Sequence, residues 1–174
     1  GNDTFTIALD SDFEVSGGTE TLDGGAGTDT LNFTAAAAHD ISAAEMGNVK
    51  SVESIVFAST TGQNQSTLGL SDTFMTNNNG VATVTSNTTA HANADHKIDA
   101  SSVGSDGSVT FVLAGNTTGK NDTLLGGGGD DVLQVGYKGL AAASTADLEA
   151  TDKFTGNGGT DTIVYDTQAD GTNG

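Results

Sequence analysis

A nine-residue pattern, in which glycines precede one aspartate and one apolar residue, occurs three times in this chain of 174 residues. The copies read GGAGTDTLN at 24–32, GGGGDDVLQ at 126–134 and GNGGTDTIV at 156–164. Glycine tolerates positive φ, so such a run turns tightly enough for several carbonyl oxygens to face one point. The aspartate adds a charged oxygen there, and the following apolar residue points into a core. The pattern predicts strands joined by oxygen-rich turns.

Two partial copies keep only the end of the pattern. Asp3 lies in GNDTFT, and Asp122 lies in GKNDTLL, nine residues before Asp131. An Asn-Asp pair before a strand also forms an ordinary Asx-turn, so a metal-ligand role and a turn role are alternatives for Asp3 and Asp122.

The order of the motifs indicates a longer repeat, because the pair Asp3 and Asp29 recurs as Asp131 and Asp161. We expect one solenoid unit with inserts over 1–125. The start of a second unit is then expected over 126–174, within a continuous solenoid that belongs to a longer chain.

Between the glycine turns lie short runs rich in Val, Ile, Thr and Phe, which are typical of strands. The runs expected as strands cover 30–33, 54–58, 81–85, 97–100, 109–113, 132–135 and 162–165. Two Ala-rich inserts differ, at 34–46 and 139–151, and each predicts one short helix. The chain has no proline, so a cluster such as 77–80, Asn-Asn-Asn-Gly, is expected to form a turn.

The charge balance excludes some classes of binding partner. Acids outnumber bases by 23 to 5, and the formal net charge is −18. Nucleic acid and anionic bilayers are therefore poor partners, and no apolar run approaches the roughly 20 residues that span a membrane. With no cysteine, neither a disulfide nor a thiolate metal site is available. Abundant carboxylates instead favour hard cations such as Ca²⁺.

One glycine turn offers too few oxygens for Ca²⁺, which takes about 6–8 ligands. Two turns stacked at the strand spacing of about 4.8 Å would have to share each ion. The sequence therefore predicts several calcium ions between neighbouring turns.

The three nonapeptides resemble the G-G-x-G-x-D calcium motif of RTX (repeats-in-toxin) proteins. That resemblance implies a parallel β-roll with Ca²⁺ between turns, and type I secretion followed by folding in extracellular calcium. It implies side-chain ligands at Asp29, Asp131 and Asp161, with Asp3 and Asp122 as further candidates. The resemblance implies that the turns complete the shell with carbonyl oxygens from Gly24, Gly25, Gly27, Gly126, Gly127, Gly129, Gly156, Asn157 and Gly159.

The scattered motifs and large inserts depart from the unbroken blocks of RTX toxins. The whole arrangement is similar to the calcium-binding domains of bacterial S-layer proteins. This resemblance implies an all-β, irregular parallel β-solenoid, secreted and located on a bacterial cell surface. The expected partners are neighbouring copies or repeats, and cell-surface polysaccharide through parts of the protein outside this sequence.

Two other functions are alternatives: the stalk of a giant adhesin or extracellular filament, and the carrier domain of a secreted enzyme. No catalytic constellation stands out, because His39 and Asp40 lie in an expected helix without a strained serine turn, and we expect no enzymatic activity. His91 and His96, in a Thr/Asn-rich stretch, are expected on the surface rather than in a metal site.

Overall fold

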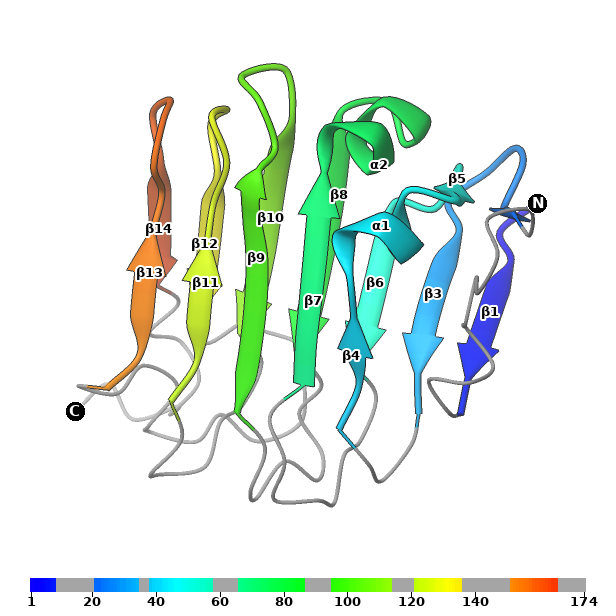
Figure 1. Ribbon diagram of the computed structural model, residues 1–174, viewed down its shortest axis with the longest axis horizontal. Coiled ribbons are helices and arrows are strands. Elements are labelled where there is room, and N and C mark those ends of the chain that lie inside the picture. Colours follow the sequence, from blue (N-terminus) through cyan, green and yellow to red (C-terminus); the bar gives the residue numbers. More distant parts are fainter. Residues whose placement is uncertain are drawn as a thin grey trace, which may run out of the picture.

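The computed structural model describes residues 1–8, 21–34, 38–57, 66–86, 95–113, 121–135 and 151–165. Within these residues the chain coils as a parallel β-solenoid whose strands form two facing sheets (Figure 1). The predicted all-β solenoid is confirmed.

One face of the solenoid is a parallel sheet of seven strands among the described residues, in the order β1-β3-β6-β8-β10-β12-β14. Each strand pairs with the equivalent strand of the next coil, so sheet order follows chain order. The strands are β1 Thr4–Ile7, β3 Thr30–Phe33, β6 Ser54–Phe57, β8 Val81–Ser86, β10 Ser108–Leu113, β12 Val132–Val135 and β14 Thr162–Tyr165.

The opposite face is a parallel sheet with five strands in the described part of the chain, in the order β13-β11-β9-β7-β4. Its strands are β4 Asp40–Ile41, β7 Ser66–Ser71, β9 His96–Ser102, β11 Thr123–Leu125 and β13 Lys153–Thr155. A separate two-stranded parallel pair consists of β2 Leu22–Asp23 and β5 Val49–Lys50, and Figure 1 shows β5 near the N-terminus.

The core lies between the two sheets, because alternate strand residues point inward. In β3 the inward residues are Leu31 and Phe33, and in β6 they are Ile55 and Phe57, all fully buried. The rings of Phe33 and Phe57 stack with centroids 5.2 Å apart. Identical positions of successive coils therefore form apolar columns along the solenoid.

At one end of the strands, the connections from the five-stranded to the seven-stranded sheet are glycine turns or short helices (Figure 1). Helix α1 Ala43–Met46 begins with a capping box between Ser42 and Glu45, and it buries Met46. Helix α2 Asp72–Asn77 buries Phe74 and Met75.

Most strand predictions are confirmed, and those at 30–33, 132–135 and 162–165 agree at both bounds. The insert at 34–46 contains the expected helix as α1, but the placement of His39 and Asp40 in that helix is wrong, because both precede α1 and Asp40 begins β4; the insert at 139–150 lies outside the described residues. Helix α2 and strand β7 were not predicted, nor were the short strands β2, β4, β5 and β13. The turn expected at 77–80 is confirmed, with Asn79 and Gly80 at φ 57° and 77°. Strand pairing also continues across position 125, from β11 to β13 and from β10 to β12.

Candidate metal-binding turns

The residues immediately before β1, β3, β6, β12 and β14 occupy the same place in their coils, and Ala82 of β8 and Val109 of β10 fill that place in the two coils between. The strand registers align these residues in one line along the solenoid axis. Five of them carry carboxylates, and we call them the carboxylate column: Asp3, Asp29, Glu53, Asp131 and Asp161. Sequence analysis identified four of the five, and it missed Glu53 because no glycine turn precedes that residue.

Four of the five carboxylates, those of Asp29, Glu53, Asp131 and Asp161, cap the backbone of the preceding coil. The amide N–H of Asp3 donates to Oδ1 of Asp29 at 2.6 Å, and the N–H of Asp29 donates to Glu53 Oε2 at 3.0 Å. The N–H of Asp131 donates to Oδ1 of Asp161, also at 3.0 Å. The acids are therefore fixed by coil stacking rather than by contacts within their own turns alone.

The column is interrupted in the middle of the solenoid. The positions between Glu53 and Asp131 are occupied by Ala82 and Val109, as the pairing of β6, β8, β10 and β12 shows. The acids consequently fall into two groups, one near each end of the sheet, and the predicted turns do not all lie together.

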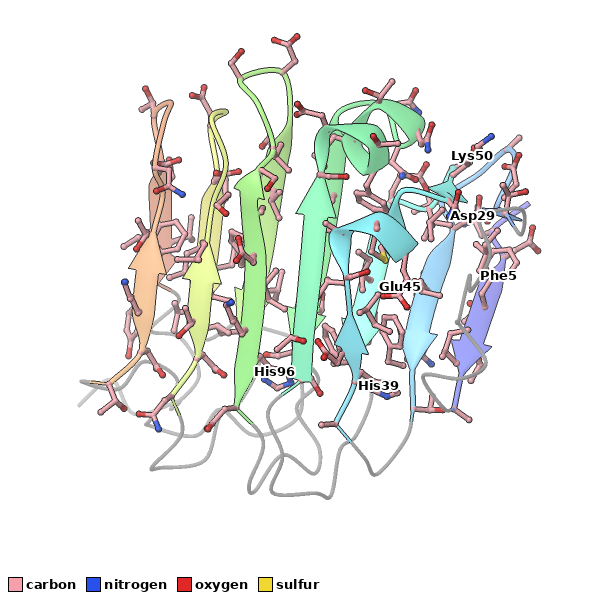
Figure 2. The ribbon with its side chains drawn as sticks, in the orientation of Figure 1. Phe5, Asp29, His39, Glu45, Lys50 and His96 are labelled. Atoms are coloured by element: carbon pink, nitrogen blue, oxygen red, sulfur yellow. The ribbon has the colours of Figure 1, made fainter. Side chains whose placement is uncertain are left out.

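The first glycine turn, 24–29, lies between the N-terminal residues and the segment around Lys50. Gly24 N–H donates to Lys50 O at 3.0 Å, and Thr28 N–H donates to Asn2 Oδ1 at 3.1 Å. Asp29 is fully buried, and its Oδ2 atom has no hydrogen-bond partner among the described residues. Figure 2 shows Asp29 near Lys50 at this end of the molecule. A buried carboxylate oxygen without a donor is a site that a cation would satisfy.

The other two glycine turns, 126–131 and 156–161, are stacked directly on each other. Gly158 N–H donates to Gly127 O at 3.0 Å, and the Asn157 side-chain amide donates to Gly126 O at 2.7 Å. Thr160 N–H donates to Asp130 Oδ1 at 2.7 Å. The structure therefore brings together two of the three predicted turns.

Glycine at the first position of each turn makes room for the aspartate at the sixth. A Cβ on Gly24 would lie 2.7 Å from Asp29 Cγ, and one on Gly126 would lie 3.0 Å from Asp131 Cγ. A Cβ on Gly156 would lie 2.9 Å from Asp161 Cβ. At the second position Asn157 has φ 71° and Gly25 has φ 83°, whereas Gly127 of the middle turn does not have a positive φ. Asparagine tolerates this left-handed conformation better than most residues.

Without a bound cation, the stacked turns hold negative charges close together, which destabilises the folded chain. Burial raises the pKa of the Asp131 carboxyl, and the negative charges of Asp161 and Asp130 raise it further. Amide donors from Val109 at 2.8 Å and Gly127 at 2.7 Å offset only part of this cost. A bound cation would remove the repulsion among the three carboxylates.

Asp122, the remaining predicted ligand, lies at the opposite end of the coil from Asp131. It precedes β11, where its Oδ1 accepts the N–H of His96 at 2.8 Å and lies 3.4 Å from His96 Nδ1. The N–H of Asp122 donates in turn to Asp152 Oδ1 at 2.9 Å. A second capping line thus borders the five-stranded sheet, and sequence analysis missed Asp152 as a member of it.

The expectation that His96 lies on the surface is wrong, and His91 lies outside the described residues. His96 is 3% exposed, with its ring 5.5 Å from that of Phe57, and His39 is equally buried against Phe33 at 5.0 Å. Figure 2 shows both histidines at the end of the strands remote from Asp29.

The donor set of the glycine turns fits a hard cation, since it consists of carboxylate and carbonyl oxygens. Among the described residues no three His, Asp or Glu side chains converge on one point. An ion here would therefore take most of its ligands from backbone carbonyls. The described part of the chain also contains no helix with the length and apolar character needed to cross a membrane.

Comparison of this chain with protein-family models, curated proteins and solved structures gave no match. Its candidate function therefore rests on its own residues and geometry.

Proposed function

We propose that this chain is a calcium-stabilised structural segment of an extracellular protein assembly on a bacterial cell surface. Its glycine turns bind Ca²⁺, and the bound ions fix the stacking of the solenoid coils. The role is mechanical rather than catalytic.

The observation that carries this proposal is the buried Asp29 carboxylate, whose Oδ2 has no hydrogen-bond partner in the described structure. Leaving such a charge unsatisfied costs several kcal/mol in a low-dielectric interior, by order of magnitude. A divalent cation held by this oxygen and by turn carbonyls would remove that cost. Calcium suits the site because it accepts irregular shells of about 6–8 oxygens.

The stacked turns at 126–131 and 156–161 support the same function independently. They place Asp131 and Asp161 on neighbouring coils and join them through the Asp131 N–H. Glycine at positions 126 and 156 leaves space beside both carboxylates that any Cβ would fill. An ion shared by the two turns would link coils that otherwise repel each other.

An extracellular setting fits the chemistry of these sites. The ligands are assembled from different coils, so an unfolded chain has no preformed site, and binding energy becomes folding energy. Sites of this type suit the sub-millimolar to millimolar calcium found outside cells. A net charge of −18 also opposes compaction until cations neutralise part of it.

The experiment is a calcium titration of the purified chain. Far-UV circular dichroism measures its β-structure and differential scanning calorimetry measures its Tm at each calcium concentration. Starting from chelator, Ca²⁺ should increase β-structure and raise Tm, whereas Mg²⁺ at equal concentration should not. At a free concentration 100 times Kd, one site should add about 2.7 kcal/mol to the free energy of unfolding.

Two variants and one control make the titration specific. Asp29→Asn and Asp131→Asn should each weaken the calcium response. Asp106→Asn removes the same charge from an exposed position in the β9–β10 turn, outside the carboxylate column, and should leave the response unchanged. Equal folding in chelator and in calcium would refute the proposal.

A further inference from the structure

The sequence contains three asparagines that are each followed by glycine, at 79–80, 157–158 and 173–174. This pair is chemically labile, because the backbone nitrogen of the second residue can attack the side chain of the first, and glycine has no side chain to hinder the attack. The pair at 173–174 lies outside the described residues. Asn79 and Asn157 are exposed, and both adopt the left-handed conformation, at φ 57° and 71°.

The reaction that threatens Asn157 is deamidation. The nitrogen of Gly158 loses its proton and forms a bond to Asn157 Cγ, the bond between Cγ and the side-chain nitrogen breaks, and ammonia leaves with the proton. Water then opens the five-membered imide. Opening at one carbonyl gives aspartate, and opening at the other gives isoaspartate, in which the main chain runs through Cγ. Water is the only other reactant.

In the folded chain, coil stacking holds both reacting groups of this pair. The Asn157 side-chain amide, which is the leaving group, donates to Gly126 O at 2.7 Å. The N–H of Gly158, which is the attacking nitrogen, donates to Gly127 O at 3.0 Å. Both acceptors belong to the preceding glycine turn, so separation of the turns 126–131 and 156–161 would release the two groups together.

The pair at 79–80 is held in a different way. The N–H of Gly80 donates to Met75 O at 2.8 Å, within the segment that ends helix α2. Buried Asn78 anchors that segment through its own side chain. The column position of this coil is Ala82 rather than an acid. Protection of Asn79 therefore depends on local helix structure and not on stacked acidic turns.

We propose that Asn157 is a self-modification site controlled by the stacking of the two glycine turns 126–131 and 156–161. While calcium holds the turns together, the amide is preserved. When calcium is lost and the turns separate, Asn157 converts to aspartate and isoaspartate. The calcium dependence rests on the proposed function, whereas the protection by stacking follows from the two hydrogen bonds themselves.

The conversion acts in one direction. An aspartate at 157 has no N–H to donate to Gly126 O, and it adds a negative charge to turns that already carry Asp130, Asp131 and Asp161. An isoaspartate lengthens the backbone of the turn by one atom. Both products oppose renewed stacking, so a prolonged absence of calcium leaves a permanent change in this coil.

The test measures deamidation of the purified chain at neutral pH in calcium, in chelator and in urea. Trypsin cuts after Lys97 and Lys153, so Asn79 and Asn157 lie on different peptides. Mass spectrometry follows the mass increase that replacement of NH₂ by OH brings. Fragmentation assigns it within the last peptide, where Asn173 also precedes a glycine. The rates in urea give the reactivity of each pair without structure.

In chelator, the rate at Asn157 should approach its rate in urea. Calcium at 100 times Kd should slow it by about 100-fold, because the reaction follows the population of separated turns. Asn79 is the internal control, and it should react slowly and at the same rate in calcium and in chelator.

Two variants of Asn157 test the assignment and its consequence. In Asn157→Gln the same attack would need a six-membered ring, so the mass increase at position 157 should disappear. Asn157→Asp copies one product and should lower Tm in chelator. Asn79→Asp is the matched control, because it adds the same charge at an exposed position away from the stacked turns, and its Tm should equal that of the wild type.

Equal rates at Asn157 in calcium and chelator, in a chain whose Tm responds to calcium, would overturn this inference alone. Equal acceleration of Asn79 and Asn157 in chelator would also overturn it, because global unfolding would then control the reaction. A chain whose Tm does not respond to calcium would refute the proposed function, and with it the calcium control of Asn157.

Discussion

The amide N–H of Asp131 donates to Oδ1 of Asp161 at 3.0 Å, although the two residues are 30 positions apart in the chain. The same relationship joins Asp3 to Asp29 at 2.6 Å. One oxygen of each motif aspartate is thus used by the preceding coil, and the other lies next to its own glycine turn. This division explains how one residue type contributes both to coil stacking and to the proposed metal sites.

Gly156→Ala should lower both the free energy of unfolding and the calcium affinity, because the new Cβ would lie 2.9 Å from Asp161 Cβ. Calcium titration followed by calorimetry measures both effects. Gly47→Ala is the matched control, since Gly47 has an ordinary φ of −60° at the end of α1. A Gly156→Ala chain with wild-type affinity would show that the cradle beside Asp161 is not used.

Asn78→Ala should destabilise the chain by about 2–4 kcal/mol whether calcium is present or not. The buried Asn78 side chain accepts from Val52 N–H at 2.6 Å and donates to Phe74 O at 2.7 Å and Val49 O at 3.2 Å. Its removal leaves buried backbone groups unpaired, at about 1–3 kcal/mol each.

Urea unfolding with and without chelator gives the size of the Asn78→Ala effect. Thr76→Ala, at an exposed position of helix α2, which Asn78 caps, should change the free energy of unfolding by less than about 0.5 kcal/mol. A loss confined to the calcium-bound state would contradict the prediction.

In chelator, the wild-type chain should become more stable as pH falls from neutral toward the ordinary carboxyl pKa. Burial raises the folded-state pKa of Asp131, so the folded chain binds more protons than the unfolded chain in that interval. The free energy of unfolding therefore falls as pH rises through this interval. Above the raised pKa, the folded chain bears the full cost of an ionised Asp131 carboxylate.

Chemical unfolding at several pH values measures this trend, and Asp131→Asn should flatten it. Saturating calcium should reverse it, since acid then displaces the metal. A chelated chain whose stability rises with pH over the same interval would contradict the assigned direction.

In chelator, the backbone amides of the central coils should exchange with solvent more slowly than those of the C-terminal coil. The segments 66–86 and 95–113 contain the long strands β7 to β10 and carry Ala82 and Val109 in place of column acids. Polar groups in their turns find hydrogen-bond partners within the protein. For example, the N–H of Gly104 donates to Asp72 Oδ1 at 2.6 Å.

The C-terminal strands β11 to β14 are shorter and border the stacked acidic turns, so their amides should exchange faster until calcium is added. Mass spectrometry of peptides from both regions gives the comparison. Uniform exchange across all strands in chelator would contradict this prediction.

The sequence predicted the strands next to glycine turns best, because Gly and Asp mark where such strands begin. It did not predict β7, whose residues Ser66–Ser71 are rich in Ser and Gly and become a strand by pairing with β4 and β9. Helix α2 was missed for a related reason: Asp, Thr and Asn are poor helix formers, and burial of Phe74 and Met75 stabilises it.

The candidate site was predictable turn by turn but not as an arrangement. Glu53 joins the column only through the pairing of β3 with β6, which no local pattern reveals. Asp122 and Asp131 share a motif, yet strand β11 and a turn separate them, so they lie at opposite ends of one coil. Long-range register, rather than local spacing, decides which acids lie together.

The gap at Ala82 and Val109 has a mechanical consequence. Hydrogen bonds between coils run along the solenoid axis, so tension between β1 and β14 would peel the coils apart one interface at a time. The β8–β10 interface pairs six residues, whereas the β12–β14 interface pairs four. A metal ion shared by the last two glycine turns would therefore strengthen the β12–β14 interface, which would separate early under tension. The central β8–β10 interface would be stabilised by its longer strand pairing alone. Such a rod would stiffen at its acidic ends in response to the surrounding calcium, with its centre unchanged.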